Sequence, residues 1–270
     1  MTDSTAAGPQ PSLRGKVAVI TGAAGMIGHA TAAALADAGA ELMLVDINAQ
    51  ALQARCKLLA RDGDSRVASC IADVSQANQV TGYVAQTLQK FGRIDLFFNN
   101  AGIEGKLAAT HEYDEQEFDH IIAVNLKGVF LGLRHVLPVM LQQGHGAIVN
   151  TASIASERGL AGACAYNASK HAVLGLTRTA ASEVGPRGVR VNAVMPGVIE
   201  TPLLEAMLRM MFDGDVAAGK KVLGRVATLD RIGTAEEVAA IVTFLLSDAA
   251  SFVNGAAWAV DGGALATIRH

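Results

Sequence analysis

Short runs of apolar and β-branched residues alternate along this chain with longer stretches in which apolar residues recur every three or four positions. The short runs predict buried strands, and the longer stretches predict amphipathic helices. The predicted strands cover residues 16–21, 41–46, 66–71, 94–99, 146–151, 190–194 and 256–260. The predicted helices cover residues 27–38, 49–62, 77–91, 115–143, 165–184 and 235–247. Because such alternation builds parallel sheets, we expect an α/β fold: a doubly wound, seven-stranded parallel sheet with helices on both faces.

The composition agrees with one folded domain. The chain has 270 residues, of which 51% are hydrophobic and 17% charged, as expected when strands are buried on both faces. We assign the domain to residues 13–270 and expect residues 1–12, rich in Ser, Thr, Ala, Gly and Pro, to form a flexible tail. Uninterrupted apolar runs do not reach the ~18 residues that a membrane span needs, so no membrane association is predicted.

Charge and cysteine spacing exclude two further classes. A net charge of −3 without a basic stripe argues against a nucleic-acid partner. The cysteines, Cys56, Cys70 and Cys164, lack the spacing of a zinc site. We therefore predict no metal and expect reduced thiols in a cytoplasmic protein.

A glycine-rich loop follows the first predicted strand. In doubly wound sheets ligands bind beyond the carboxyl ends of the strands. Glycines let the backbone approach a pyrophosphate, and the next helix supplies amide donors, although an ordinary tight turn has the same composition. The predicted cofactor-binding residues of this loop are Gly22, Gly25, Met26, Ile27 and Gly28.

Asp46 ends the second predicted strand, and Ile47 follows it. A carboxylate at this position binds the adenosine ribose hydroxyls and repels a 2′-phosphate. Residues 26–48 contain no Arg or Lys, so NAD(H) is the predicted cofactor.

Two later strand ends contribute further polar or small residues. Asp73 and Val74 are predicted at the adenine edge, and Asn100, Ala101 and Gly102 allow close approach of a cofactor. Each group alone is more typical of a polar strand-end cap.

Tyr166 and Lys170 are four residues apart on a predicted helix and share one face. A nearby cation lowers a tyrosine pKa, which would make Tyr166 a general acid or base. Ser153 could then hold the oxygen whose proton moves. The spacing by itself is also typical of a solvated helix face.

Taken in order, these motifs resemble the short-chain dehydrogenase/reductase family over residues 13–264. The matching landmarks are Thr21 to Gly28, Asp46, Asp73, Asn99 to Gly102, Asn125, Ser153, Tyr166, Lys170, Pro196, Gly197, Thr201 and Val260 to Gly263. One departure is Met26, where the family usually has glycine, and it implies a reshaped phosphate turn. The resemblance implies a single-domain Rossmann fold and a homotetramer assembled through residues 118–140, residues 165–181 and the C-terminal strand.

The resemblance also implies roles for the catalytic set. Tyr166 exchanges the alcohol proton, Lys170 lowers the Tyr166 pKa and bonds the nicotinamide ribose, and Ser153 orients the substrate oxygen. Asn125 would position a water that links Lys170 to solvent. The residues that would contact the nicotinamide are Pro196, Gly197, Ile199 and Thr201.

Residues 200–224 are rich in Leu and Met and follow the sixth predicted strand. They predict either a core-facing helix or a lid over the site, with hinges at residues 213–214 and 218–219. The predicted substrate residues, besides Ser153 and Tyr166, are Glu104, Glu157, Met207 and Met211. The two glutamates are more typical of a solvated rim or an ion pair.

We therefore expect an NAD-dependent enzyme that interconverts a hydrophobic, cyclic or terpenoid-like secondary alcohol and its ketone. The alternatives are a 3-oxoacyl-thioester (acyl-carrier-protein) reductase, which would want a basic group near Asp46, and a glucose-type sugar dehydrogenase, which an apolar lid suits poorly. A non-catalytic nucleotide-binding protein would not need the set of Asn125, Ser153, Tyr166 and Lys170.

Overall fold

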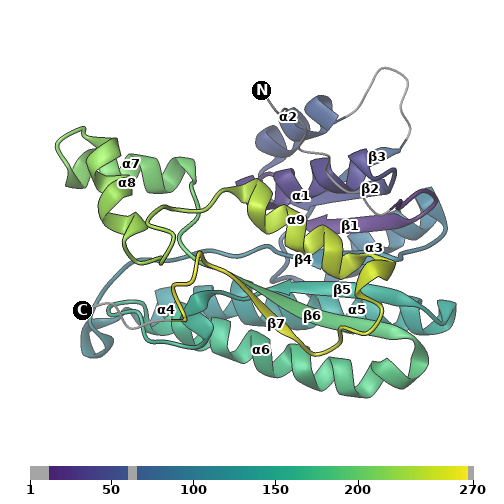
Figure 1. Cartoon of the computed structure of the whole chain (residues 1–270). Coiled ribbons are helices and arrows are strands. Elements are labelled where there is room, and N and C mark those ends of the chain that lie inside the picture. The colour runs from purple at the N-terminus through teal and green to yellow at the C-terminus, as the bar shows by residue number, and fades with distance from the viewer. Residues whose placement is uncertain (1–11, 60–65, 267–270) are drawn as a thin grey trace, which may run out of the picture.

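The computed structural model describes residues 12–59 and 66–266, so the predicted tail, Ser12 excepted, lies outside the described residues. The strands form one parallel sheet in the order β3-β2-β1-β4-β5-β6-β7 (Figure 1), as predicted. They are β1 (Val17–Thr21), β2 (Glu41–Asp46), β3 (Val67–Ile71), β4 (Leu96–Asn99), β5 (Gly146–Thr151), β6 (Val189–Pro196) and β7 (Ala257–Val260). The α-helices are α1 (Met26–Asp37), α2 (Ala49–Leu59), α3 (Ala77–Phe91), α4 (Glu115–Ile122), α5 (Gly128–Gln143), α6 (Cys164–Val184), α7 (Pro202–Met211), α8 (Val216–Gly224) and α9 (Ala235–Leu246).

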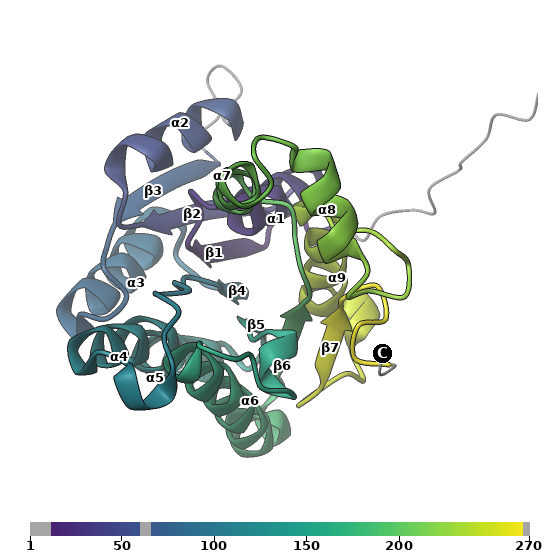
Figure 2. The same cartoon turned by 90° about the vertical axis from the view of Figure 1, so that its left-hand side faces the viewer.

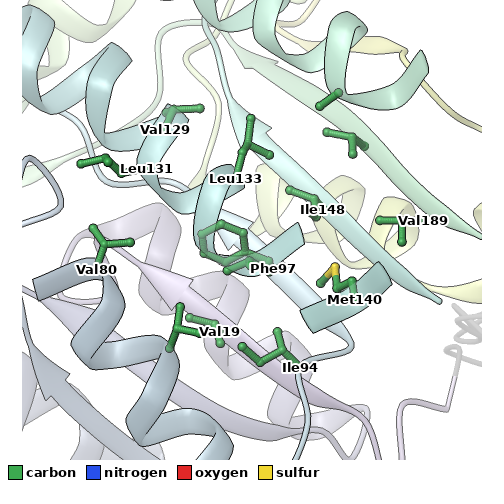
Figure 3. Packing of buried hydrophobic residues seen from close by; sticks show 14 of the residues in the cluster. Val19, Val80, Ile94, Phe97, Val129, Leu131, Leu133, Met140, Ile148 and Val189 are labelled. Atoms are coloured by element: carbon green, nitrogen blue, oxygen red, sulfur yellow. The ribbon is translucent and has the colours of Figure 1, made fainter. Parts of the chain in front are cut away.

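Helices cover both faces of the sheet, and each face has its own apolar core. Successive residues of a strand point to opposite faces, so Val19 packs toward α3, α5 and α6, whereas Ala18 and Ile20 pack toward α1 and α9. Figure 2 shows the two helical layers on either side of the twisted sheet. Figure 3 shows Phe97 of β4 at the centre of the first core, with Leu133 of α5 and Ile148 of β5 around it.

The predicted helix over residues 115–143 is interrupted. Between α4 and α5 lies one π-helical turn, η2 (Ala123–Lys127), in which the Gly128 amide bonds the Ala123 carbonyl. Such π-turns insert one extra residue into the helix and are frequent at functional sites. This turn carries Asn125 and buries it completely.

The same stretch, Glu115–Gln143, is long and apolar enough to cross a membrane, with a mean hydropathy of 1.3. Polar residues interrupt its apolar positions, so it does not form an uninterrupted apolar run. In the structure Leu133, Val136 and Met140 pack into the core beneath the sheet. Packing inside the fold accounts for the buried part of this apolar stretch, which is 44% of it.

Residues 200–224 form two helices rather than one. Asp213 and Gly214, with φ of 47° and 91°, make the turn between α7 and α8, so the first predicted hinge coincides with a real break. The second predicted hinge is wrong. Gly219 lies inside α8, where an added Cβ would come within 2.7 Å of Leu208 Cδ2, so this glycine allows α7 and α8 to pack closely.

A buried carboxylate joins three strands at the amino edge of the sheet. Asp95, only 1% exposed, accepts hydrogen bonds from the Val17 amide (2.9 Å), the Arg93 guanidinium (2.6 and 2.8 Å) and His145 Nε2 (2.8 Å). Burial alone raises the pKa of Asp95, but the bonds from Arg93, Val17 and His145 outweigh it and hold the pKa below its usual value. The starts of β1, β4 and β5 are thereby tied to one charge.

We predict that Asp95→Asn destabilises the protein by about 1–3 kcal/mol at neutral pH, because Arg93 and the Val17 amide lose a charged acceptor. The folded-state pKa of Asp95 is depressed, so its contribution is present above the unfolded value of about 3.9 and is lost as pH falls through the folded value. Urea unfolding of both proteins from pH 7 to pH 3 should show the difference shrinking at acid pH. A constant difference would contradict this account, and Glu205→Gln, in an exposed pair with Arg209, is the control.

Candidate active site

The glycine-rich loop between β1 and α1 leaves no room for side chains at two of its glycines. Gly22 has φ of 65°, and an added Cβ would lie 2.9 Å from Ala101 Cα. At Gly28 an added Cβ would lie 2.2 Å from the Gly22 carbonyl oxygen. Within the described chain no side chain caps the first turn of α1, so its amides are available to an anion. This cradle fits the pyrophosphate of a dinucleotide.

Asp46 holds the loop from the end of β2. Its Oδ2 accepts from the Ala24 amide (3.0 Å), and its Oδ1 accepts from the Asn48 amide (2.9 Å). Ile47 beside it is exposed. The carboxylate therefore sits where the sequence predicts it, at the carboxyl edge of the sheet and against the glycine-rich loop.

The next two strand ends differ in what their side chains do. Asp73 caps its own turn by accepting from the Ser75 amide (2.9 Å), and Val74 is buried beneath Gly128. Asn100 instead closes the loop, because its side-chain amide donates to the Thr21 carbonyl (3.0 Å). The strand-end cap considered for Asp73 is thus present in the structure.

Thr21, which the sequence analysis gave only as the first residue of the matching loop and without a role, is a structural member of this edge. Its hydroxyl oxygen accepts from the Asn100 amide (2.9 Å) and the Ala101 amide (3.1 Å). It joins the ends of β1 and β4 and places Ala101 and Gly102 beside the loop. Its position directly before Gly22 is the only signal of this role in the sequence.

Tyr166 and Lys170 share one face of α6, as their spacing predicts. Lys170 Nζ lies 5.7 Å from the centroid of the Tyr166 ring and donates to the Thr151 carbonyl at the end of β5 (2.8 Å). Lys170 is only 4% exposed. Burial lowers the pKa of its ammonium to about 8, against a smaller raising effect of the Glu104 carboxylate.

The expected lowering of the Tyr166 pKa is not found. Burial is the largest influence and raises it, and the Glu104 carboxylate raises it further, while a hydrogen bond with the Ser153 side chain lowers it by less. The prediction considered the cation and could not include burial of the phenol, which disfavours the phenolate. Burial therefore favours the neutral phenol of Tyr166, which lies close enough to the Ser153 side chain for that hydroxyl to act on its pKa.

Asn125 lies next to the lysine but uses its side chain on the backbone. Its Oδ1 accepts from the Ile103 amide and its Nδ2 donates to the Ile103 carbonyl, both at 2.8 Å. A Cβ added to Gly102 would meet Asn125 Oδ1 at 3.2 Å and Lys170 Nζ at 3.4 Å. These contacts fix the loop after β4 above the lysine, and the predicted water-positioning role stays a prediction.

Ser156 is a further buried member of the site that the sequence analysis missed. Its hydroxyl accepts from the Ser153 amide (3.2 Å) and donates to the Lys170 carbonyl (2.8 Å). Ser153 in turn accepts from the Ala155 amide (3.1 Å), which closes a capping box around the short helix η3 (Ile154–Ser156). A serine three residues after Ser153 is the sequence signal for this box.

The residues predicted around the nicotinamide have structural contacts of their own. Gly197 packs against Asp261, where an added Cβ would lie 2.8 Å from Asp261 Cα. Pro196 ends β6, and Ile199 is buried in the core formed with α1 and α9. Thr201 caps α7 by accepting from the Leu204 amide (3.1 Å).

The predicted substrate residues are only partly brought together. Glu104 is exposed but acts electrostatically on both Tyr166 and Lys170, so it lies at the site. Glu157 is exposed, whereas its neighbour Arg158 bonds the Ala264 carbonyl and holds the C-terminal segment. Met211 is 66% exposed at the end of α7. The side chain of Met207 lies outside the described residues.

A family model described as enoyl-(acyl carrier protein) reductase matches residues 22–264. The chain belongs to the short-chain dehydrogenase/reductase family. It is therefore an oxidoreductase, and members of this family typically use nicotinamide cofactors.

Among curated members of the family, levodione reductase of Leifsonia aquatica is 44% identical over 256 residues, covering 94% of this chain and 96% of that protein. The 3-oxoacyl-[acyl-carrier-protein] reductase of Thermotoga maritima is 40% identical and covers 93% and 98% of the two chains. Cyclohexanol dehydrogenase of Acinetobacter sp. (strain SE19) is 39% identical and covers 92% and 94%.

Two solved structures of family members superpose closely on this one. The crystal structure of levodione reductase has a TM-score of 0.89 at 44% identity, covering 94% of this chain and 99% of that chain. That of NAD+-bound xylitol dehydrogenase has a TM-score of 0.87 at 34% identity, covering 93% and 99%. These similarities extend over nearly the whole described domain.

We predict that burial of Lys170 gives the short-chain dehydrogenase a characteristic pH dependence of stability. The folded pKa of about 8 lies below the ordinary value of 10.5, so the unfolded chain binds more protons between these values. Stability should therefore rise with pH in that window, by about 2–3 kcal/mol between pH 7 and pH 10 relative to Lys170→Met, which lacks the group. Urea unfolding of both proteins measures this. Parallel pH curves would contradict it, and Lys57→Met, on the exposed side of α2, controls for loss of any lysine.

Proposed function

We propose that this short-chain dehydrogenase interconverts a hydrophobic, cyclic or terpenoid-like secondary alcohol and its ketone with NAD(H). The observation that carries the proposal is the grouping of Ser153, Tyr166 and Lys170 at the carboxyl edge of the sheet. The phenol lies close to the Ser153 side chain, and the buried Lys170 ammonium lies 5.7 Å from the centroid of its ring, beside a cradle that fits a dinucleotide. Asn125 completes the proposed catalytic set.

NAD(H) would be held by the glycine-rich loop and Asp46 and, when bound, would supply hydride transfer to or from the carbon that carries the substrate oxygen. Ser153 and Tyr166 hold the substrate oxygen by their hydroxyl groups. During ketone reduction the Tyr166 phenol donates its proton to that oxygen, and during alcohol oxidation the phenolate accepts it. Ser153 stabilises the negative charge that develops on the oxygen.

Burial raises the pKa of Tyr166, whereas a neighbouring ammonium such as that of Lys170 would favour the phenolate. The raised pKa of Tyr166 keeps the phenol protonated at neutral pH, which suits it to act as an acid in ketone reduction. The ammonium of Lys170, held by the Thr151 carbonyl, stabilises the phenolate left behind. The site is accordingly proposed to favour ketone reduction at neutral pH, where the Tyr166 phenol and the Lys170 ammonium both carry their protons.

The choice of NAD(H) rests on Asp46. Its carboxylate is fixed against the loop by the Ala24 and Asn48 amides and would accept hydrogen bonds from ribose hydroxyls. The similarity to an NAD+-bound xylitol dehydrogenase supports this choice. The other proposed cofactor contacts are the glycine-rich loop residues, Ile47, Asp73, Val74, Asn100 to Gly102, Tyr166, Lys170, Pro196, Gly197, Ile199 and Thr201.

An apolar substrate is supported by side chains exposed on the loops that follow β4 and β5. Leu107 and Leu160 are exposed there, and their loops are joined by the bond from the Ala108 amide to the Gly162 carbonyl (2.9 Å). Met211, with Met207, would face the substrate if α7 and α8 act as a lid. Similarity to cyclohexanol dehydrogenase and levodione reductase supports a cyclic substrate.

Assembly and location are proposed on simpler grounds. Phe118 of α4 and Phe130 of α5 are exposed, as expected if these helices form an interface of a homotetramer. All three cysteines are free, in keeping with a cytoplasmic protein.

We predict that Tyr166→Phe lowers the rate of cyclohexanol oxidation with NAD+ by about 10²–10⁴-fold, because the proton-transfer group is removed. NADH should still bind, since the phosphate cradle and Asp46 are intact. Initial rates of NADH formation and calorimetric titration with NADH measure the two effects. Near-wild-type turnover by the variant would refute the proposed mechanism.

The substrate class has its own test with the wild-type protein. Cyclohexanol and bulky cyclic ketones with NAD(H) should be turned over faster than a 3-oxoacyl thioester with NADPH or glucose with NAD+. The thioester is included because a 3-oxoacyl-[acyl-carrier-protein] reductase is a relative at 40% identity. Preference for the thioester with NADPH would replace the proposed substrate and cofactor.

A further inference from the structure

A second charged side chain reaches the loop residue that Asp46 holds. Arg55, from α2, donates from Nε to the Ala24 carbonyl (3.3 Å), while Asp46 accepts from the Ala24 amide (3.0 Å). The Asp46 carboxylate thus binds the amide of Ala24, and the Arg55 guanidinium binds the carbonyl of the same residue. The sequence prediction of NAD(H) considered only residues 26–48 and did not include this cation.

Met26 packs against the same guanidinium. Arg55 Nη2 lies 3.9 Å from Met26 Sδ. A thioether is a weak acceptor, so this contact leaves most of the hydrogen-bonding capacity of the guanidinium unused. The residue that departs from the usual glycine therefore orients Arg55 beside the phosphate turn.

The position of Arg55 bears on cofactor selectivity. A carboxylate at the end of β2 binds the ribose 2′-hydroxyl and repels a 2′-phosphate, whereas an arginine nearby accommodates that phosphate. The planar guanidinium can bind two phosphate oxygens at once. Arg55 is only partly buried, so it can reach a ligand at the outer edge of the loop.

We propose that Arg55 forms, with the Ala24–Met26 turn, a binding site for the 2′-phosphate of NADP(H) that the charge of Asp46 masks. The proposal rests on the proposed NAD(H) site and extends it. Selectivity for NAD(H) then depends on the single negative charge of Asp46, and removing that charge exposes a cation already in place.

The test measures cofactor binding rather than turnover. Dissociation constants for NADH and NADPH are determined by calorimetry for the wild type, Asp46→Asn, Asp46→Asn/Arg55→Gln and Asp46→Asn/Lys57→Gln. Asp46→Asn should tighten NADPH binding by about tenfold or more, since like-charge repulsion is replaced by a phosphate–guanidinium pair. The added Arg55→Gln should abolish most of that gain.

Lys57 provides the matched control, because it is an exposed cation on the same helix that does not contact the loop in the structure described. Asp46→Asn/Lys57→Gln should keep the gain in NADPH binding. Equal NADPH affinity of Asp46→Asn and Asp46→Asn/Arg55→Gln would overturn the role of Arg55 while leaving the proposed function intact. Failure of the wild type to bind NADH would overturn the proposed cofactor, and this inference with it.

Discussion

The buried ammonium of Lys170 is the constraint around which the carboxyl edge of the sheet is arranged. A charge with so little exposure needs a fixed acceptor, and the Thr151 carbonyl supplies it across the junction of β5 and α6. Ser156 adds a second tie from the Ser153 amide to the Lys170 carbonyl. Together these bonds fix the position of α6 relative to the end of β5. Tyr166, one helical turn before Lys170, therefore lies beside Ser153. The lowered pKa of Lys170 shows that its charge is held there at a cost in stability, as is usual at functional sites.

Polar groups deep in the fold support this arrangement from below. Asn150 of β5 donates to the Thr177 hydroxyl on α6 (3.0 Å) and accepts from Asn99 of β4 (3.2 Å). A Cβ added to Gly132 of α5 would come within 2.9 Å of the Asn99 side chain, so this glycine lets α5 close over the network. At the opposite edge Asp95 binds the starts of three strands. The sheet is therefore fixed at both ends, which leaves its loops free to differ among relatives with different substrates.

The strands and most helices could be predicted because buried parallel strands are short apolar runs and the intervening helices are amphipathic. Two site residues could be located because they lie at strand ends, namely Asp46 and Ser153. The other two, Tyr166 and Lys170, could be located because they are four residues apart on a predicted helix. The spacing of Ser153 and Ser156 marks a capping box, but the bond of Ser156 to the Lys170 carbonyl could not be predicted. The role of Arg55 could not be predicted either, since both depend on contacts with residues distant in sequence. The predicted direction of the Tyr166 pKa shift was wrong, because the shift depends on burial of the phenol and the spacing of Tyr166 and Lys170 does not reveal burial. The break between α7 and α8 was partly visible in Asp213 and Gly214, whereas Gly219 serves packing that only the folded pair of helices defines.

Transfer of a hydride between a nicotinamide and a cyclic carbonyl carbon is the central claim about this protein. It is tested most directly with NADH that carries deuterium at its transferring position and a cyclic ketone such as cyclohexanone. Mass spectrometry of the alcohol formed by the wild-type protein should show one deuterium on the carbinol carbon. An alcohol without deuterium, or no alcohol while NADH is demonstrably bound, would contradict the account.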